Sequence, residues 1–289
     1  TRQDEQSLWD GVQNIPDDEI WNIHRSLKRR LIEIIVTRAQ KRWIDGDTQP
    51  QQIITMGVLF DPDVLTIGFS RRFAEYKRAA LILQDIPRLS KIVNNPWHPV
   101  QIVFSGKAHP NDSAGKAVLQ QVYNAAAERA FHGRIAFVED YDMHIARYLV
   151  HGVDVWLNNP WRPLEASGTS GMKAGVNGIP NMSVRDGWWE EGYNGSNGWA
   201  IGKGPEGSAD RNQNPEDAES LYNLIENHIV PAYYQRDRKG VPHQWVGMAK
   251  ESIRSVMPHF CTRRMMREYI EKLYLPLLKR RQGERAVSG

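Results

Sequence analysis

The sequence of 289 residues contains one cysteine, Cys261, which excludes an internal disulfide and a thiolate metal site. A single thiol suits a reducing compartment, so we expect a cytoplasmic protein. No apolar run approaches the roughly 18 residues that a membrane span needs, and no secretory pattern opens the sequence, so we expect no membrane partner. The histidines at 109, 144 and 151 fit no metal-ligand spacing, which predicts no metal site.

The sequence also has no large excess of charge of one sign. The 37 Lys and Arg residues nearly balance 34 Asp and Glu, and no block of five like charges occurs, which argues against a nucleic-acid partner. We expect the densest basic stretches, 28–30 and 279–281, to lie at helix ends. Hydrophobic residues at 40% and charged residues at 25% are ordinary for a globular chain. Because residue 1 is Thr, we expect a processed protein or an excised piece.

Short apolar runs alternate with helical patterns along most of the chain. The first 50 residues are predicted helical, with an N-cap signature at Asp17 and Asp18. Strands are predicted at 64–69, 100–104, 134–138, 153–157 and 179–184, with a candidate sixth strand at 199–201. Helices are predicted at 73–92 (with a break near Pro87), 112–131, 143–150, 168–176, 215–234 and 244–278. A surface loop is predicted at 202–215.

This alternation is typical of parallel strands covered on both faces. The fold class predicted is α/β, a doubly wound, Rossmann-like sheet with C-terminal helices, whose ligands bind beyond the carboxyl ends of the strands. The expected organisation is an N-terminal helical segment (1–50), a Rossmann-like core (51–243) and C-terminal helices (244–289).

A basic motif, Ser-Arg-Arg-Phe-Ala-Glu-Tyr-Lys-Arg at 70–78, directly follows the first predicted strand. A helix beginning there would offer free N–H groups, and Arg and Lys side chains suit a phosphate. The alternative is a solvated helix start. Because basic residues at a helix N-terminus oppose the helix dipole, their presence needs a reason.

A second motif at 163–175 is rich in small residues, which let the backbone approach a ligand closely. Lys173 follows one turn into the predicted helix, where desolvation would lower its pKa and make it a nucleophilic amine. The spacing matches neither the phosphate loop of nucleotide hydrolases nor the dinucleotide fingerprint. By spacing alone a solvated lysine is the more frequent outcome, and Glu165 could equally be a surface carboxylate.

The stretch 186–195 (Asp-Gly-Trp-Trp-Glu-Glu-Gly-Tyr-Asn-Gly) combines turn residues with aromatic side chains. Its favoured interpretation is an ordered loop held by buried Trp. The alternative is a carbohydrate-facing lip, because aromatic faces beside carboxylates suit sugars.

Together these motifs resemble the carboxyl-terminal half of α-glucan (glycogen, starch or maltodextrin) phosphorylases. Residues 165–173 (Glu-Ala-Ser-Gly-Thr-Ser-Gly-Met-Lys) resemble the family's pyridoxal-phosphate motif, and 71–78 resemble its substrate-phosphate motif. Residues 105–110 also match, and 186–195 resemble the shorter bacterial branch. The likeness runs in order from about residue 65 to 201.

The resemblance implies an enzyme that transfers a terminal glucosyl unit of an α-1,4-glucan to inorganic phosphate, giving glucose 1-phosphate with retention. Lys173 would form the Schiff base with pyridoxal 5'-phosphate, whose phosphate group relays a proton to or from the substrate phosphate. The residues implied to hold the cofactor phosphate are Arg71, Gly168, Thr169 and Ser170. Those implied to hold the substrates are Arg72 and Lys77 for phosphate, and Glu165, Tyr76, Ala166, Ser167 and Gly168 for glucose.

This sequence departs from the family's pattern at two positions, with Arg71 where Lys is usual and Gly171 where many members have Asn. The family fold, of the GT-B type, has two Rossmann-like domains across a cleft, and only one fits here. The resemblance therefore implies a missing N-terminal domain as partner, an isolated piece without activity, and exposed closing helices that favour homo-oligomers.

Two other functions stay open at this point. One is a nucleotide-sugar glycosyltransferase of the same architecture, such as a glycogen or starch synthase, which has no need for Lys173. The other is a phosphate- or carbohydrate-binding module without turnover.

Overall fold

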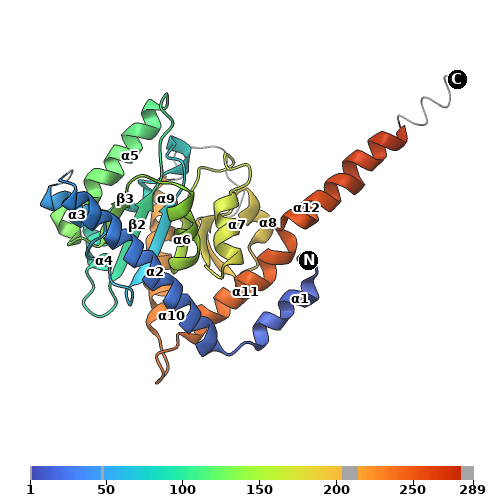
Figure 1. Cartoon of the computed structure of the whole chain (residues 1–289), viewed down its shortest axis with the longest axis horizontal. Helices are drawn as coiled ribbons and strands as arrows, with labels where there is room; N and C mark the ends of the chain where they lie inside the picture. Colours follow the sequence, from blue (N-terminus) through green and yellow to red (C-terminus); the bar gives the residue numbers. More distant parts are fainter. Residues whose placement is uncertain (1, 47–48, 204–213, 281–289) are drawn as a thin grey trace.

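The computed structural model describes residues 2–46, 49–203 and 214–280. Its centre is a six-stranded, all-parallel sheet in the order β3-β2-β1-β4-β5-β6 (Figure 1). The strands are β1 (Leu65–Ser70), β2 (Val100–Ser105), β3 (Ile135–Val138), β4 (Val155–Asn158), β5 (Asn181–Val184) and β6 (Gly198–Ile201). All six lie within or close to the predicted runs, and the doubly wound, Rossmann-like sheet is confirmed.

The strands are buried because the side chains on both faces of the sheet pack against other parts of the protein. In β1 the side chains of Leu65, Ile67 and Phe69 pack into the larger core cluster. On the other side of the same strand, Gly68 leaves room for Val153: a Cβ at Gly68 would lie 2.7 Å from Val153 Cγ1. Apolar packing on both faces explains why the strands appear in the sequence as nearly unbroken apolar runs.

Helices cover both faces of the sheet. The larger core cluster contains side chains from α4 (Ile86–Val93), α5 (Ser113–Ala126), α9 (Asn214–Leu224) and α10 (Val230–Tyr234). The other face packs against α2 (Asp17–Ile44), α6 (Met143–Gly152) and α7 (Thr169–Val176). Apart from two 3₁₀ turns between β1 and α4, the other helical elements are α1 (Gln6–Asp10), η1 (Gly11–Asn14), α3 (Pro50–Thr55), η4 (Arg129–Phe131), α8 (Trp188–Gly192), η6 (Ile225–Ile229), α11 (His243–His259), α12 (Thr262–Tyr269) and η7 (Ile270–Tyr274).

The helix predicted at 73–92 is wrong. The chain forms two short 3₁₀ turns, η2 (Glu75–Lys77) and η3 (Leu81–Leu83), before α4 begins. Arg78 has φ +49°, in the left-handed region, which a continuous α-helix excludes. Pro87 lies in the first turn of α4 instead of breaking a helix, and Asp85 caps that turn by accepting from Arg88 N.

Three smaller predictions also need correction. Pro16, not an aspartate, is the N-cap of α2, and Asp17 instead forms an ion pair with Lys250. Lys28 is not at a helix end but buried in the middle of α2, where it donates to Asp154. The predicted helix 112–131 ends as α5 at residue 126. Most of the predicted loop 202–215 lies outside the described residues.

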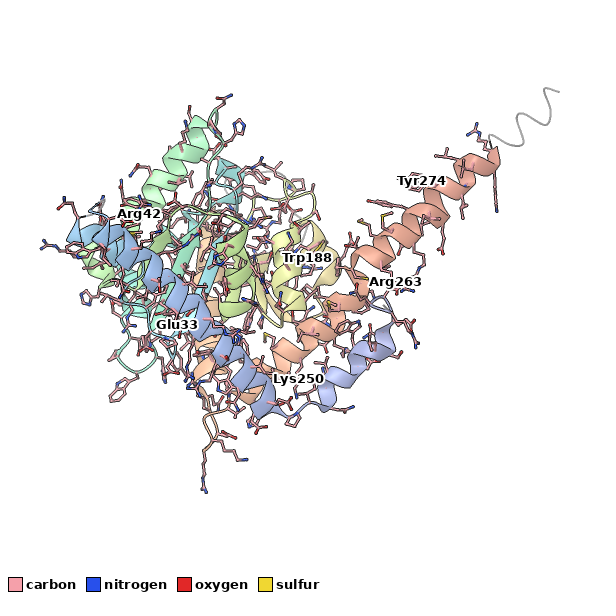
Figure 2. The ribbon with its side chains drawn as sticks, viewed as in Figure 1. Glu33, Arg42, Trp188, Lys250, Arg263 and Tyr274 are labelled. Carbon is pink, nitrogen blue, oxygen red and sulfur yellow. The ribbon has the colours of Figure 1, made fainter. Side chains whose placement is uncertain are left out.

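The C-terminal helices divide at residues 260–261. α11 packs against α7 and α1, whereas α12 and η7 extend away from the body of the molecule (Figure 1). Figure 2 shows Tyr274 on this extension, far from the sheet. Leu273, Tyr274 and Leu277 are each more than half exposed. Within the residues that the structure describes, none of the helices has the length and apolarity to cross a membrane.

Candidate active site

The two motifs meet at the centre of the sheet. β1 and β4 are neighbours there, and the strand order reverses between them, since β2 and β3 lie on one side and β5 and β6 on the other. In doubly wound sheets, ligands bind outside the carboxyl ends of the strands at this switch point. The loop after β1 carries residues 71–78, and the loop after β4 leads to residues 165–168. The topology therefore brings together two segments about 90 residues apart in the sequence.

Glu165 binds two cations of the first motif. Arg71 Nη1 lies 3.2 Å from Glu165 Oε2, and Lys77 Nζ donates to the same oxygen. All three residues are at most 8% exposed. Burial lowers the pKa of the Arg71 guanidinium, and the Glu165 carboxylate opposes that shift. Two buried cations share one carboxylate, so the cluster keeps one uncompensated positive charge and can attract an anion.

The basic residues of the first motif do not lie at a helix N-terminus, where the sequence placed them. The loop after β1 leads into the single 3₁₀ turn η2, so the expected helix N-terminus is absent from this motif. Lys77 is buried against Glu165, which contradicts the alternative of a solvated helix start. Arg72 is exposed. Tyr76 is half-buried, with its ring centroid 4.5 Å from Lys77 Nζ.

The second motif forms the N-terminus of α7, as predicted. Gly168 is the N-cap, with φ +92°, and no side chain of the described part of the chain caps the first turn. The N–H groups of Thr169 and Ser170 thus point out of a helix start, where an anion is stabilised. Arg71 Nη2 lies 3.4 Å from Ser170 Oγ, and Arg71 Nε is buried without a hydrogen-bond partner among the described residues. These unused donors fit a phosphate group.

Gly171, one of the two departures from the family pattern, has a structural reason. A Cβ at this position would lie 2.7 Å from Asn181 Oδ1 and 2.8 Å from Trp188 Nε1. The indole of Trp188 therefore occupies the space that a side chain at 171 needs.

Lys173 lines a cavity of about 1020 Å³ together with Glu165, Ala166, Ser167 and Thr169. Its side chain is exposed, which agrees with the solvated lysine that spacing alone favours and contradicts the alternative of a desolvated amine. The reason is its place on α7: Ala174 and Gly175 face the protein interior, and Lys173 faces the cavity. The same cavity is also lined by α12 and its flanks, with side chains of Cys261, Met265, Tyr269 and Leu273.

Sequence reasoning missed the residues that hold the loop at 165–168. Asp186 accepts from Glu165 N at 2.8 Å and from Gly187 N at 2.9 Å, and Trp188 N donates to Ser167 O at 2.8 Å. Burial raises the pKa of Asp186, and the nearby Glu165 carboxylate adds to that rise. The Asp-Gly pair directly after a predicted strand was the available signal. Trp188 is 2% exposed, as the favoured interpretation of this stretch predicted.

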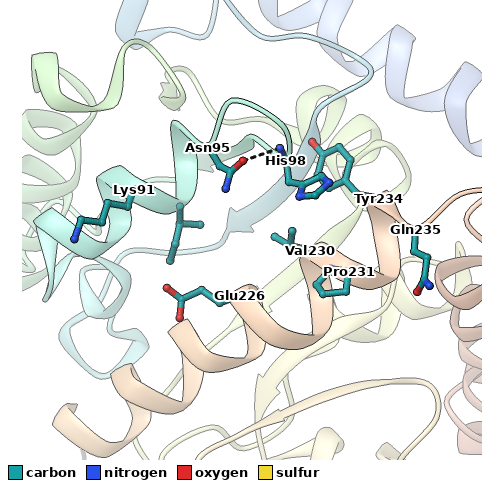
Figure 3. Close-up of a pocket in the computed structure, with 9 residues that line it drawn as sticks. Lys91, Asn95, His98, Glu226, Val230, Pro231, Tyr234 and Gln235 are labelled. Carbon is teal, nitrogen blue, oxygen red and sulfur yellow. Dashed lines mark hydrogen bonds between the residues drawn. The ribbon is translucent and has the colours of Figure 1, made fainter.

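A second hollow of about 710 Å³ lies elsewhere, between α4 and the helix formed by η6 and α10 (Figure 3). Its lining includes Asn95, His98 and Glu226 but none of the predicted site residues. Glu226 is already bound by Arg88, and His98 lies just before β2, at the amino ends of the strands. Because ligands of this fold bind at the carboxyl ends, the candidate site is the cavity at Lys173.

Comparison with known proteins agrees with this geometry. Residues 22–190 match the family model described as carbohydrate phosphorylase. The chain is 53% identical to a glycogen phosphorylase of Aquifex aeolicus over 96% of its length, and 52% identical to a maltodextrin phosphorylase of Thermococcus litoralis over 93%. A glycogen phosphorylase of Mycobacterium bovis is 42% identical over 93% of the chain. The chain spans 40% of the first of these relatives and 31% of the other two. The chain belongs to the carbohydrate phosphorylase family.

Proposed function

We propose that this chain is the carboxyl-terminal catalytic part of a retaining α-1,4-glucan phosphorylase, which transfers a terminal glucosyl unit to inorganic phosphate and forms glucose 1-phosphate. The observation that carries the proposal is the placement of Arg71, Lys77 and Glu165 beside the uncapped start of α7. Phosphorolysis requires an anionic nucleophile to approach a neutral sugar. This site offers two buried cations, whose shared partner Glu165 lines the cavity of about 1020 Å³.

The cofactor proposed is pyridoxal 5'-phosphate, and the residues present fit it. Lys173 and Thr169 line the cavity, and the N–H groups of Thr169 and Ser170 together with Arg71 would bind the cofactor phosphate at the start of α7. When bound, the cofactor supplies a second phosphate group, which moves a proton to or from the substrate phosphate. Lys173 would hold the cofactor covalently through its amine.

The remaining roles follow from charge and position. Arg72 and Lys77 would bind the substrate phosphate, and their charges would keep two anions close together in spite of their repulsion. Glu165 and the backbone of 166–168 would orient the glucose hydroxyls, with Tyr76 nearby. In this arrangement the chain's own residues bind and orient, so that the phosphate oxygen faces the anomeric carbon while the glycosidic oxygen leaves with a proton.

We infer that the other wall of the site comes from an N-terminal domain of the GT-B type, because the chain spans less than half of its phosphorylase relatives. The apolar side chains of the extension at 265–278 are exposed without it. An exposed apolar stripe of this kind favours association, either with that domain or with a second copy of the chain.

The test is phosphorolysis by the full-length protein. Incubation with maltodextrin and phosphate should release glucose 1-phosphate, and Lys173→Ala should abolish this release. The matched control is Lys116→Ala, which removes an exposed lysine on α5 and should keep full activity. Glucose release without phosphate, or a requirement for a nucleotide sugar, would contradict the proposal.

A further inference from the structure

Next to the site lies a buried cluster of two arginines and one carboxylate. Arg78 Nη2 lies 2.7 Å from Asp217 Oδ2, and Arg162 Nη2 lies 3.0 and 3.3 Å from the two oxygens of Asp217. The exposed fractions are 5% for Arg78, 7% for Arg162 and 1% for Asp217. Two guanidinium groups thus depend on a single carboxylate, in a region that water reaches poorly.

Arg78 joins the two loops that carry the proposed site. Its guanidinium donates to Asn159 O at 2.8 Å and to Pro160 O at 3.0 Å, and Asn159 Nδ2 donates back to Arg78 O at 2.9 Å. Arg78 directly follows Lys77 in the sequence. The conformation of this arginine therefore fixes where the chain presents the Lys77 ammonium.

Arg162 extends the connection to the segment after β6. It precedes Glu165 by three residues, and its Nη1 donates to Lys203 O at 2.9 Å. Gly202, with φ +73°, allows Asp217 to approach this segment closely, because a Cβ there would lie 2.1 Å from Asp217 Oδ1. The first turns of α9 thus hold the residues on both sides of the site through one carboxylate.

We propose that Asp217 is a positioning residue, which holds the loops of Lys77 and Glu165 in place and thereby keeps the Lys77 ammonium where it binds phosphate. This inference rests on the proposed function. Removing the charge of Asp217 leaves two buried guanidinium groups that repel each other and lack a counter-ion, a situation that folded proteins relieve by moving the charged groups apart. Because the guanidinium groups of Arg78 and Arg162 are also bonded to backbone carbonyls, we expect their separation to shift the loops that carry Lys77 and Glu165.

The first experiment is Asp217→Asn in the full-length protein, with phosphate affinity measured by calorimetry and by the KM for phosphate. We expect phosphate binding to weaken by at least about tenfold while maltodextrin KM changes less. The matched control is Asp154→Asn. Asp154 is fully buried and also binds two basic side chains, Lys28 and His24, but it lies at the amino end of β4. Below its unfolding temperature this control should bind phosphate as the wild type does.

The second experiment separates positioning from a general loss of packing. If Asp217 acts through Lys77, Asp217→Asn should cost much less phosphate affinity in a Lys77→Ala background than in the wild type, because the group being positioned is gone. Additive losses would overturn the inference, as would equal losses in the Asp154→Asn control.

A further variant, Arg162→Lys, allows the proposal to be tested if Asp217→Asn does not fold. Arg162→Lys retains the charge but cannot contact Asp217 and Lys203 O together, and we expect a smaller loss of phosphate affinity, about three- to tenfold. Unchanged affinity in this variant would then overturn the inference. A wild-type protein that binds phosphate but forms no glucose 1-phosphate would instead contradict the proposed function.

Discussion

The Glu165 carboxylate occupies the cations that the proposed mechanism assigns to phosphate. Arg71 and Lys77 both donate to one of its oxygens, and all three groups are buried. A phosphate that enters the site must therefore share or displace this carboxylate. We predict that Glu165→Gln, which keeps the shape and removes the charge, binds inorganic phosphate more tightly than the wild type does.

The expected size follows from the charges. Two unit charges 3–4 Å apart interact by about 4–5 kcal/mol at an effective dielectric constant of about 20. The amide still accepts a hydrogen bond and the incoming phosphate is itself desolvated, so we expect a net gain of about 1–2 kcal/mol, or about 5- to 30-fold in affinity. Turnover should fall at the same time, because the variant lacks the carboxylate proposed to hold glucose.

Calorimetric titration of the full-length protein with phosphate measures this affinity directly. Glu226→Gln is a suitable control, since Glu226 also pairs with an arginine, Arg88, but at the second hollow. Weaker phosphate binding by Glu165→Gln would refute the reasoning, because the carboxylate would then support the anion site instead of competing for it.

Three further predictions concern the cofactor, the phosphate and the pH dependence. Arg72→Ala and Lys77→Ala should each lower kcat/KM for phosphate by about 10- to 150-fold, which corresponds to about 1.5–3 kcal/mol. Kinetics with varied phosphate measure this loss, and an unchanged phosphate dependence in both variants would mean that these side chains do not bind phosphate. Borohydride reduction and peptide mapping should place a pyridoxyl group on Lys173, whereas a label on another lysine would contradict the assignment. Hydrogen bonds to Asp17 and a second aspartate raise the pKa of His243, so the protonated histidine stabilises the fold below about pH 6.5, and that stabilisation is lost as the pH rises through the raised value. The melting temperature of His243→Gln should accordingly be lower than that of the wild type near pH 5.5 and equal to it near pH 9. An equal decrease at both pH values would exclude the charge of His243 as the source of the stabilisation.

The strands and the position of the site could be predicted because each depends on local pattern. Buried parallel strands are continuous apolar runs, and in this fold the ligands bind just after them, so the runs at 64–69 and 153–157 predict which loops matter. The start of α7 was equally visible, because small residues precede an apolar helix. These features need no knowledge of distant contacts.

The errors arose where distant contacts decide the structure. The apolar spacing at 73–92 imitates a helix, yet these side chains enter the core from irregular turns because Arg78 reaches across to the loop after β4. Asp217 is 139 residues from Arg78 in the sequence, and no local pattern connects them. Such pairings are set by the topology as a whole.

The central claim is that this chain holds one wall of a phosphorylase active site. It would supply the residues that bind the cofactor and phosphate, but not the glucose contacts of the opposing wall. Its most direct test is glucose 1-phosphate release from maltodextrin and phosphate, with pyridoxal 5'-phosphate present, by this chain alone and then with a separately made N-terminal half. We predict release only when both parts are present, because the open cavity at Lys173 admits water and lacks half of the sugar contacts. Turnover by this chain alone at the rate of a full-length phosphorylase, or none with both parts present and folded, would contradict the account.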